Sequence, residues 1–284
     1  MRILSLVTGS LLLCLGSAGC DLLGPIVGSG RELRETREVE PFSAVVVGGS
    51  LEAEITLDPE QEQLVEISGD DNIVPEVRAR VSGGELVLDL PPSLGIDPSL
   101  PLVVTIHAKA LSGLATRDSA QASANAVEGG AVVVASKDSS ELSVGRIAAG
   151  ASLSVSTGDS SSSSIEVAEV EGSVAVLTSD SSMLDVGTLT AGDSVELTSG
   201  DSSDVTLRGS TPVLEADLSD STSVKAAKLS AAQVIIRASS SSSGEVCATS
   251  SLDATLSDSS SVVYTCNPES VTKSLEDSSS LTEK

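Results

Sequence analysis

The residues of this sequence that could do chemistry are carboxylates set at regular spacing. The tripeptide Asp-Ser-Ser, or a close variant of it, recurs through the second half of the chain. Its anchor aspartates are Asp118, Asp138, Asp159, Asp180, Asp201, Asp220, Asp258 and Asp277, with Ser240 where one more would fall. Successive anchors are 20, 21, 21, 21, 19, 20, 18 and 19 residues apart. Hard oxygen ligands suit Ca²⁺, so this ladder could be a weak divalent-cation site or a protein-docking strip.

The same aspartates also have a structural interpretation. Asp side chains cap tight turns by accepting hydrogen bonds from nearby backbone N–H groups. The Gly-Gly-x-Gly-x-Asp pattern of calcium-binding solenoids is absent from the sequence. We therefore favour turn capping and assign no cofactor, with weak Ca²⁺ binding as the alternative. The Ser residues beside the ladder are interpreted as rows of solvated hydroxyl groups.

The elements that position this ladder are predicted by the repeat itself. A period of about 20 residues is typical of a solenoid, in which each repeat is one coil stacked on the next. Apolar residues stand six and four positions before each anchor, and often four and six positions after it. Around Asp138 these are Val132, Val134, Leu142 and Val144. Side chains two positions apart in a strand share one face, so both sets are expected inside and the turn at an edge.

The expected fold is an all-β, right-handed parallel β-helix (a β-solenoid) with about 8–9 coils of 18–21 residues in the C-terminal half. Acidic, Ser-rich composition is also typical of disordered stalks, but disorder does not require an alternating apolar registry. Residues 39–112 show shorter alternating runs broken by Gly, Pro and Asp, which predict less regular N-terminal coils. We expect residues 39–284 to form one domain, with the Asp-Ser-Ser repeats over 113–284.

Composition excludes several classes of function. A formal charge of −25 argues against nucleic acid and anionic membrane surfaces as partners, because both repel a polyanion. One Phe, one Tyr and no Trp leave few aromatic platforms for sugar rings. His107 has no Cys or second His nearby and is interpreted as a packing or surface residue. Acids are so abundant that no catalytic pair stands out, and we expect no enzyme activity.

The first twenty residues resemble a bacterial lipoprotein signal. Arg2 precedes an apolar stretch that is too short to span a membrane. Ser17-Ala18-Gly19-Cys20 resembles a lipobox, although Ser17 stands where Leu is usual. We predict a signal peptide over 1–19, lipid attachment at Cys20 and a flexible tether over 20–38. The alternative is ordinary cleavage with Cys20 as an incidental thiol. Lipidation would hold an exported protein at a membrane of the cell envelope without spanning it.

A second pair of cysteines lies near the C-terminal end. Cys247 and Cys266 are 19 residues apart, and each stands five residues before the first inward position of the next coil. Neighbouring coils are about 4.8 Å apart, which is within disulfide range, and export permits oxidation. We predict a disulfide between them; two free thiols in a turn are the alternative.

Several segments, taken together, resemble the bacterial head GIN domain family, labelled auto-transporter adhesins. They are Gly28-Ser29-Gly30, Arg37-Glu38-Val39 leading to Phe42, Val45-Val46-Val47-Gly48, Val65-Glu66-Ile67, Gly69-Asp70-Asp71-Asn72, Val81 and Gly83-Gly84-Glu85-Leu86. The resemblance covers roughly residues 28–280, and that family commonly has Gly-Ser-Gly where this chain has Asp-Ser-Ser. It implies a right-handed β-helix, a role in cell adhesion and no demonstrated catalytic residues.

These features together predict a non-enzymatic lipoprotein of the cell envelope. It would make adhesive or protein–protein contacts through an acidic Asp/Ser edge, with an unknown envelope or surface protein as partner. One alternative is a structural module that binds divalent cations, and another is a polysaccharide-active β-helix enzyme. Homo-oligomerisation and the choice between inner and outer membrane stay open.

Overall fold

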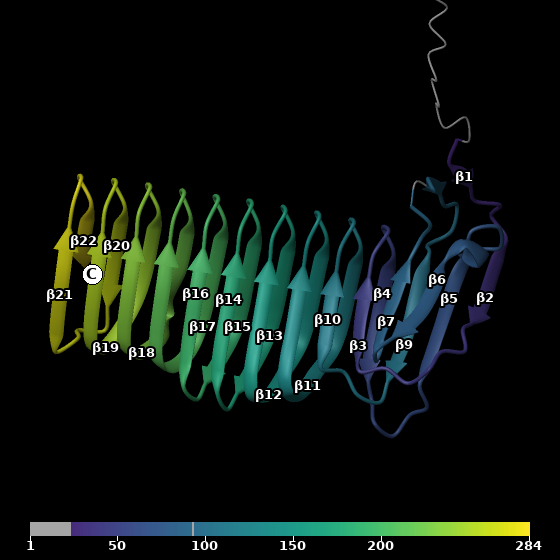
Figure 1. Ribbon diagram of the computed structural model, residues 1–284, viewed down its shortest axis with the longest axis horizontal. Helices are drawn as coiled ribbons and strands as arrows, with labels where there is room; N and C mark the ends of the chain where they lie inside the picture. The colour runs from purple at the N-terminus through teal and green to yellow at the C-terminus, as the bar shows by residue number, and fades with distance from the viewer. Residues whose placement is uncertain (1–23, 93) are drawn as a thin grey trace, which may run out of the picture.

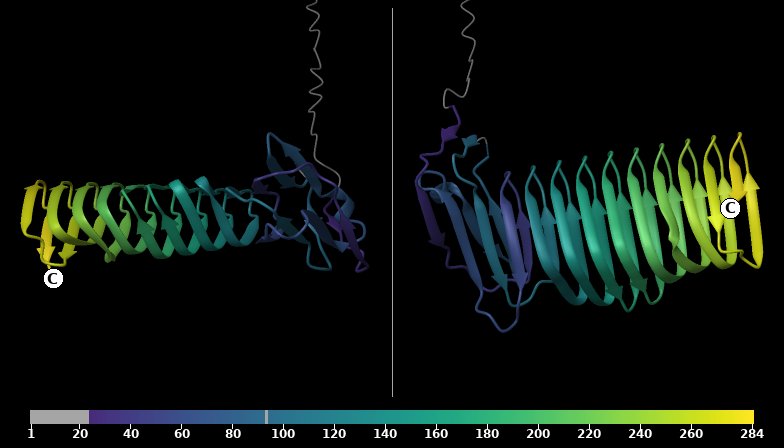
Figure 2. Two further views of the ribbon diagram at one scale, coloured as in Figure 1. Left: turned by 90° about the horizontal axis from the view of Figure 1, so that it is seen from below. Right: turned by 180° about the vertical axis from the view of Figure 1, so that it is seen from behind.

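The computed structural model describes residues 24–92 and 94–284, and strands dominate it (Figure 1). Parallel coils stack into a β-solenoid of about 9 turns over residues 113–283. The coils form a straight rod, and the N-terminal region makes a broader end (Figure 2). The all-β solenoid predicted from the repeat is confirmed.

The strands of the solenoid follow one another around and along the rod. They are β10 (Gly113–Thr116), β11 (Gln121–Ser136), β12 (Glu141–Thr157), β13 (Ser162–Val170), β14 (Ser173–Thr178), β15 (Met183–Ala191), β16 (Ser194–Ser199), β17 (Asp204–Leu218), β18 (Ser223–Ala238), β19 (Ser243–Leu256), β20 (Ser261–Thr265), β21 (Ser270–Leu275) and β22 (Ser280–Glu283). Each pairs in parallel with the equivalent strand of the next coil, so that Val134 lies opposite Leu114 on one side and Val155 on the other.

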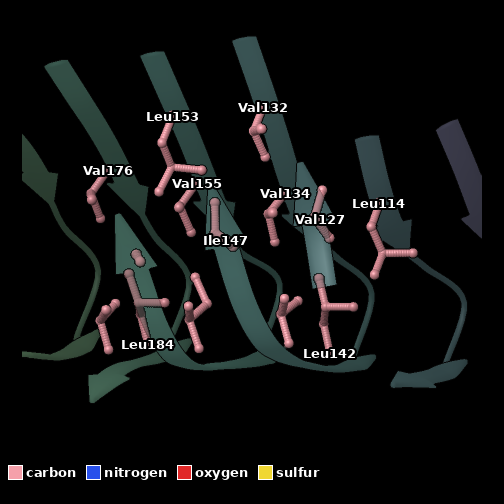
Figure 3. Packing of buried hydrophobic residues seen from close by; sticks show 14 of the residues in the cluster. Leu114, Val127, Val132, Val134, Leu142, Ile147, Leu153, Val155, Val176 and Leu184 are labelled. Atoms are coloured by element: carbon pink, nitrogen blue, oxygen red, sulfur yellow. The ribbon is translucent and has the colours of Figure 1, made fainter. Parts of the chain in front are cut away.

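The interior consists of aliphatic columns that run along the rod. The predicted inward positions are buried, with Val132 and Leu142 1% exposed and Val134 and Val144 fully covered. Side chains from the two flanks of a turn, such as Val134 and Leu142 around Asp138, point into the same interior (Figure 3). Two sheet faces about 10 Å apart leave a space that Val, Leu, Ile and Ala fill without large rings. The narrow interior is consistent with the scarcity of aromatic residues.

Every Asp-Ser-Ser segment is a tight turn with a left-handed backbone. In the turn of Asp180 and Ser181 the two φ angles are 55° and 61°, and the other anchors repeat this pattern. Two successive left-handed residues define a type I′ turn. Asp adopts this region more readily than most residues other than Gly and Asn, which suits it to this position.

A backbone ladder joins these turns from coil to coil. The N–H of Ser160 donates to the carbonyl of Asp180 at 2.8 Å, and the N–H of Ser181 donates to the carbonyl of Asp201 at 2.8 Å. The same bond recurs at each turn, from Ser50 and Asp118 at one end to Ser259 and Asp277 at the other. The turns therefore stack in register along one edge of the rod (Figure 1).

The N-terminal region continues the two sides of the solenoid with mixed pairing. Its elements are β1 (Ile26–Val27), β2 (Glu32–Thr36), β3 (Ala44–Val47), β4 (Glu52–Leu57), β5 (Leu64–Asp70), the 3₁₀ helix η1 (Val74–Glu76), β6 (Arg78–Ser82), β7 (Glu85–Asp89), β8 (Ile96–Asp97) and β9 (Val103–Ala108). Parallel pairs link β10 to β3 and β3 to β7 on one side, and β11 to β4 and β4 to β9 on the other. Antiparallel strands then follow: β6 pairs with β7, β5 pairs with β9, and β2 pairs with β5.

This region corrects two expectations. Residues 39–112 are only partly coils, because β5 and β6 run antiparallel to their neighbours. The tether predicted over 20–38 is also wrong for its second half, since residues 32–36 form β2 and pair with β5. The strand alternates half-buried and exposed residues, and Leu33 packs against the core. A short amphipathic strand hidden among charged residues gave too weak a pattern to recognise.

The left-handed turns yield a first prediction. Replacing Ser181 by Gly should raise the melting temperature, because an L-residue in this region costs about 1–2 kcal/mol and Gly costs less. Replacing Ser181 by Val should destabilise the protein by about 1–3 kcal/mol, since a β-branched residue is strained at this φ. Thermal melts followed by circular dichroism would compare the three proteins. Equal melting temperatures would mean that the turn is not strained.

Candidate functional site

The anchor aspartates form one exposed row. All eight, together with Ser240, are exposed at the tip of their turns, and the backbone ladder sets them one coil apart. Adjacent carboxylates at about 4.8 Å repel each other by about 0.9 kcal/mol in water, which is tolerable only while the row stays solvated or meets positive charge. The eight predicted site residues are thus brought together on a single edge, the Asp/Ser edge.

The carboxylates of this edge have few partners. Among the described residues, only Asp118 and Asp258 have side-chain partners: Arg117 at 3.2 Å from Asp118, and the hydroxyl of Ser257 at 3.0 Å from Asp258. None accepts a hydrogen bond from its own turn's backbone. The turn-capping role that we favoured from the sequence is therefore wrong, and it is the backbone of these aspartates that builds the turn. In residues 24–92 and 94–284, no three His, Cys, Asp or Glu side chains converge as metal ligands do.

The two Ser residues of each repeat lie in different environments. The first, such as Ser181, is exposed beside the Asp, whereas the second, such as Ser182, is only 2% exposed. The expected solvated hydroxyl rows are therefore half right. The second Ser of the repeats, or the Thr that replaces it, forms a buried row inside the rod. This row consists of Ser140, Ser161, Ser182, Ser203, Thr222, Ser242 and Ser260.

Another buried row of hydroxyl groups comes from the residues two positions before the anchors of the more N-terminal coils. It consists of Thr116, Ser136, Thr157, Thr178 and Ser199, after which Leu218, Ala238 and Leu256 take the same position. The hydroxyls bond to one another, as Thr178 does with Ser199 at 2.6 Å. They also bond to backbone carbonyls, as Ser182 does with Thr157 at 2.8 Å. Buried hydroxyl groups are costly unless bonded, and these rows satisfy that requirement.

These buried hydroxyls are the structural residues that the sequence interpretation missed. A usable signal was present, because they stand two positions before and two positions after each anchor. Those positions continue the alternation of inward residues across a two-residue turn. The hydroxyls also cap the turn, since Ser140 Oγ accepts the N–H of Lys137 at 3.1 Å and Ser279 Oγ accepts that of Glu276 at 3.1 Å. Serine was assigned to solvent because of its polarity, although its position indicated the interior.

The other chemically interesting residues are scattered. Cys247 and Cys266 form a disulfide with Cα atoms 5.3 Å apart, joining β19 to the start of the last coil. Tyr264 donates its hydroxyl to Glu283 at 3.2 Å, and burial together with that carboxylate raises the pKa of Tyr264. His107 is half-buried on β9, with a buried Nδ1 that has no hydrogen-bond partner in the described structure. These side chains lie on different elements and do not form a catalytic group.

The Gly-Asp-Asp-Asn segment, quoted above for its family resemblance, organises the N-terminal end. Asp70 is 1% exposed, and its carboxylate accepts backbone N–H groups of Gly30 at 2.7 Å, Ser99 at 2.9 Å and Leu100 at 3.0 Å. Asn72 exchanges hydrogen bonds with the backbone of residues 27–29. Gly28 lies so close to Asp70 that a Cβ there would be 2.3 Å from the carboxylate. The segments Gly28-Ser29-Gly30 and Gly69-Asp70-Asp71-Asn72 thus form one clamp.

The charge of Asp70 is stabilised by this clamp. Burial alone would raise the pKa of Asp70, but the three backbone N–H donors outweigh it and lower the pKa below its ordinary value. The carboxylate is therefore a structural group that orders the loops on either side of β5.

The predicted signal peptide over 1–19 and the lipid attachment at Cys20 lie outside the described residues. No helix in residues 24–92 and 94–284 combines the length and apolar character that crossing a bilayer requires.

Comparison with known families identifies the fold and its relatives. The family model described as "Putative auto-transporter adhesin, head GIN domain" matches residues 41–167 and 159–268. The chain belongs to the head GIN domain family. The resemblance seen in the Gly-Asp-Asp-Asn clamp and the turn repeats is therefore confirmed. No curated protein matches the chain.

Solved structures of similar proteins share the fold at low identity. A "Putative lipid binding protein" from Parabacteroides distasonis is 17% identical, with a TM-score of 0.67, covering 92% of this chain and 100% of its own. A "putative adhesin" from Parabacteroides merdae is 14% identical, with a TM-score of 0.68, covering 91% of this chain and 98% of its own. A second "putative adhesin" from Parabacteroides distasonis is 16% identical, with a TM-score of 0.67, covering 92% and 100%.

The Asp70 clamp of this head GIN domain protein predicts that part of the protein's stability is lost in acid. Because the folded pKa of Asp70 is lowered, its stabilising effect is complete above its ordinary pKa, near pH 4, and is lost as pH falls through the lowered value. Asp70→Asn should lower the melting temperature at neutral pH. The difference in melting temperature between wild type and variant should narrow in acid.

The measurement is a series of thermal melts between neutral and acid pH. Asp253→Asn is the matched control, because Asp253 is exposed on β19 and has no partner among the described side chains. A gap for Asp70→Asn that stays constant with pH would contradict the assignment.

The disulfide yields a further prediction. A bond that closes a loop of this size stabilises a fold by about 3 kcal/mol, and here it holds the last coil. Replacing both Cys247 and Cys266 by Ser should speed amide hydrogen exchange in β20, β21 and β22, while β12 and β13 stay protected. Exchange rates unchanged in the last coil would show that backbone pairing alone holds it.

Proposed function

We propose that this chain is a non-enzymatic adhesin of the cell envelope that makes its contacts through the Asp/Ser edge. The observation that carries the proposal is the unbroken stack of exposed Asp and Ser residues, held in register by the backbone ladder. Membership of a family described as adhesins suggests an extracellular or envelope location and a binding role.

The chemistry of the edge favours a basic partner. Each carboxylate repels its neighbours, so the arrival of Lys or Arg side chains relieves an existing repulsion as well as adding attraction. The rigid spacing lets several charges act at once, whereas a single exposed ion pair is worth about 0–1 kcal/mol. The exposed hydroxyls of the first Ser row add hydrogen-bonding groups beside each carboxylate. A Lys- or Arg-rich protein segment lying along the rod fits this surface.

The shape of the rod favours binding over catalysis. Catalysis needs a nucleophile, a base and a stabilising group held together in one recess. The groups of those types noted above lie apart on β9, β19 and the turn tips. We further propose that Cys20 carries the lipid anchor and that the rod extends away from the membrane. Such an anchor would leave the whole Asp/Ser edge accessible to a partner on another surface.

The experiment is a comparison of partner capture by three proteins. Asp180, Asp201 and Asp220 are replaced together by Asn, which also tolerates the left-handed turn and therefore keeps the fold. The control replaces Glu166, Glu171 and Glu196 by Gln, so the net charge changes equally. These carboxylates are exposed, lie away from the edge and have no partner among the side chains that the structure describes. The immobilised soluble domain is incubated with envelope extract, and retained proteins are identified by mass spectrometry.

The edge variant should lose partners that the wild type and the control retain. Its binding free energy should fall by about 0.5–3 kcal/mol for three exposed pairs, and the wild-type binding should weaken as salt rises. A chelator should leave the wild-type binding unchanged, since the proposal uses no bridging cation. Equal losses in the edge variant and the control would contradict a specific role of the edge.

A further inference from the structure

A cluster of cations lies beyond the Asp/Ser edge, on the strands that follow two neighbouring turns. Arg208 on β17 and Lys225 and Lys228 on β18 surround a cavity of about 230 Å³, which Thr206, Ala227 and Glu245 also line. The whole chain has 16 Lys and Arg residues against 41 Asp and Glu residues. With Asp185, which pairs with Arg208, three cations meet two carboxylates here, so the local charge is positive although the whole chain is strongly negative.

A β-bulge creates the cavity. Thr206 lies opposite Lys225, but two residues later Arg208 lies opposite Lys228, so β18 carries one extra residue between its pairing positions. The next coil is shorter at this point. Ala226 pairs with Val246 and the next pair is Ser230 with Cys247, so four residues of β18 correspond to a single step along β19. Bulges of this kind re-aim side chains and break the close packing of neighbouring strands. The cations therefore gather where two coils of different length meet.

The positive groups of this cavity are incompletely paired. Arg208 Nη1 donates to Asp185 at 2.5 Å and to the carbonyl of Val186 at 3.4 Å. Among the described residues, neither its Nε nor its Nη2, nor the ammonium of Lys225 or Lys228, has a hydrogen-bond or ion-pair partner. Arg208 and Lys228 lie opposite each other on adjacent strands, an arrangement that like charges disfavour. The cluster therefore keeps unpaired N–H donors available, although its positive charges repel one another.

We propose that this cavity binds a phosphate group. Arg208, Lys225 and Lys228 carry three positive charges against the carboxylates of Glu245 and of Asp185, which pairs with Arg208, so the site keeps a net positive charge that suits an anion with several acceptor oxygens. Arginine supplies a planar fork that suits phosphate oxygens, and the two lysines supply point charges. The net charge of −25 does not prevent binding, because charges beyond about 8 Å are screened at physiological salt. The phosphate could be free or borne by a small soluble molecule, and this proposal does not depend on the function of the Asp/Ser edge.

The test is a titration of the ¹⁵N-labelled domain with inorganic phosphate at pH 8 and constant ionic strength, with chloride as reference. Amide shifts should concentrate at residues 206–208, 225–228 and 245 and saturate with a Kd of about 1 mM. A parallel titration with glucose 1-phosphate distinguishes the source: tighter binding of the sugar phosphate favours a borne group, and equal or weaker binding favours the free ion. Both outcomes support the site.

Charge variants decide whether the site is specific. Lys228→Gln and Arg208→Gln should each weaken phosphate binding by about tenfold, which corresponds to about 1.4 kcal/mol. Lys137→Gln is the control, because Lys137 is an exposed lysine beside a turn on another coil. Circular dichroism checks that all three fold. The proposal is overturned if no saturable shifts occur, if the shifts spread over the whole surface, or if the control weakens binding as much as the cavity variants.

Discussion

Stacking of every coil directly over the one before it is the constraint on which the rest of this structure depends. An inward residue is buried only because the equivalent residues of the neighbouring coils lie above and below it, as Leu114, Val134 and Val155 do. A slip of one residue would turn each inward column toward solvent. The turn ladder opposes such a slip, because each Ser N–H has its acceptor only on the anchor residue of the next coil. Aliphatic columns and turn ladder therefore specify the same register.

The same stacking has electrostatic consequences at the two surfaces considered for binding. It places exposed carboxylates in a row at the turns, although each one repels the next. It also places Arg208 beside Lys228 where the coil length changes. In both places the backbone register decides which charges are neighbours, and the energy of aliphatic burial sustains an arrangement that the charges themselves oppose. A partner of opposite sign would relieve this repulsion at either surface.

The N-terminal end shows how the solenoid begins. Parallel pairing gives way to antiparallel strands, and the buried carboxylate of Asp70 orders the loops that join them by accepting three backbone N–H groups. Close approach of the backbone at Gly28 leaves no space for a side chain there. The solved structures that share this fold are only 14–17% identical to the chain.

The amino-acid sequence by itself determined the repeating part of this protein, because period and alternation are both written in consecutive residues. The anchors at Asp138 and its equivalents, the inward positions such as Val134, and the coil-to-coil proximity of Cys247 and Cys266 all follow from counting along the chain. The tertiary structure alone decided what depends on neighbours from other coils. It placed the second Ser of each repeat inside, where other hydroxyls and carbonyls satisfy it, and it recruited residues 32–36 into a sheet. It also brought Arg208, Lys225 and Lys228 to one cavity through a bulge. Polarity predicts a residue's preference for water, but the partners that compensate for burial are visible only when the coils are stacked.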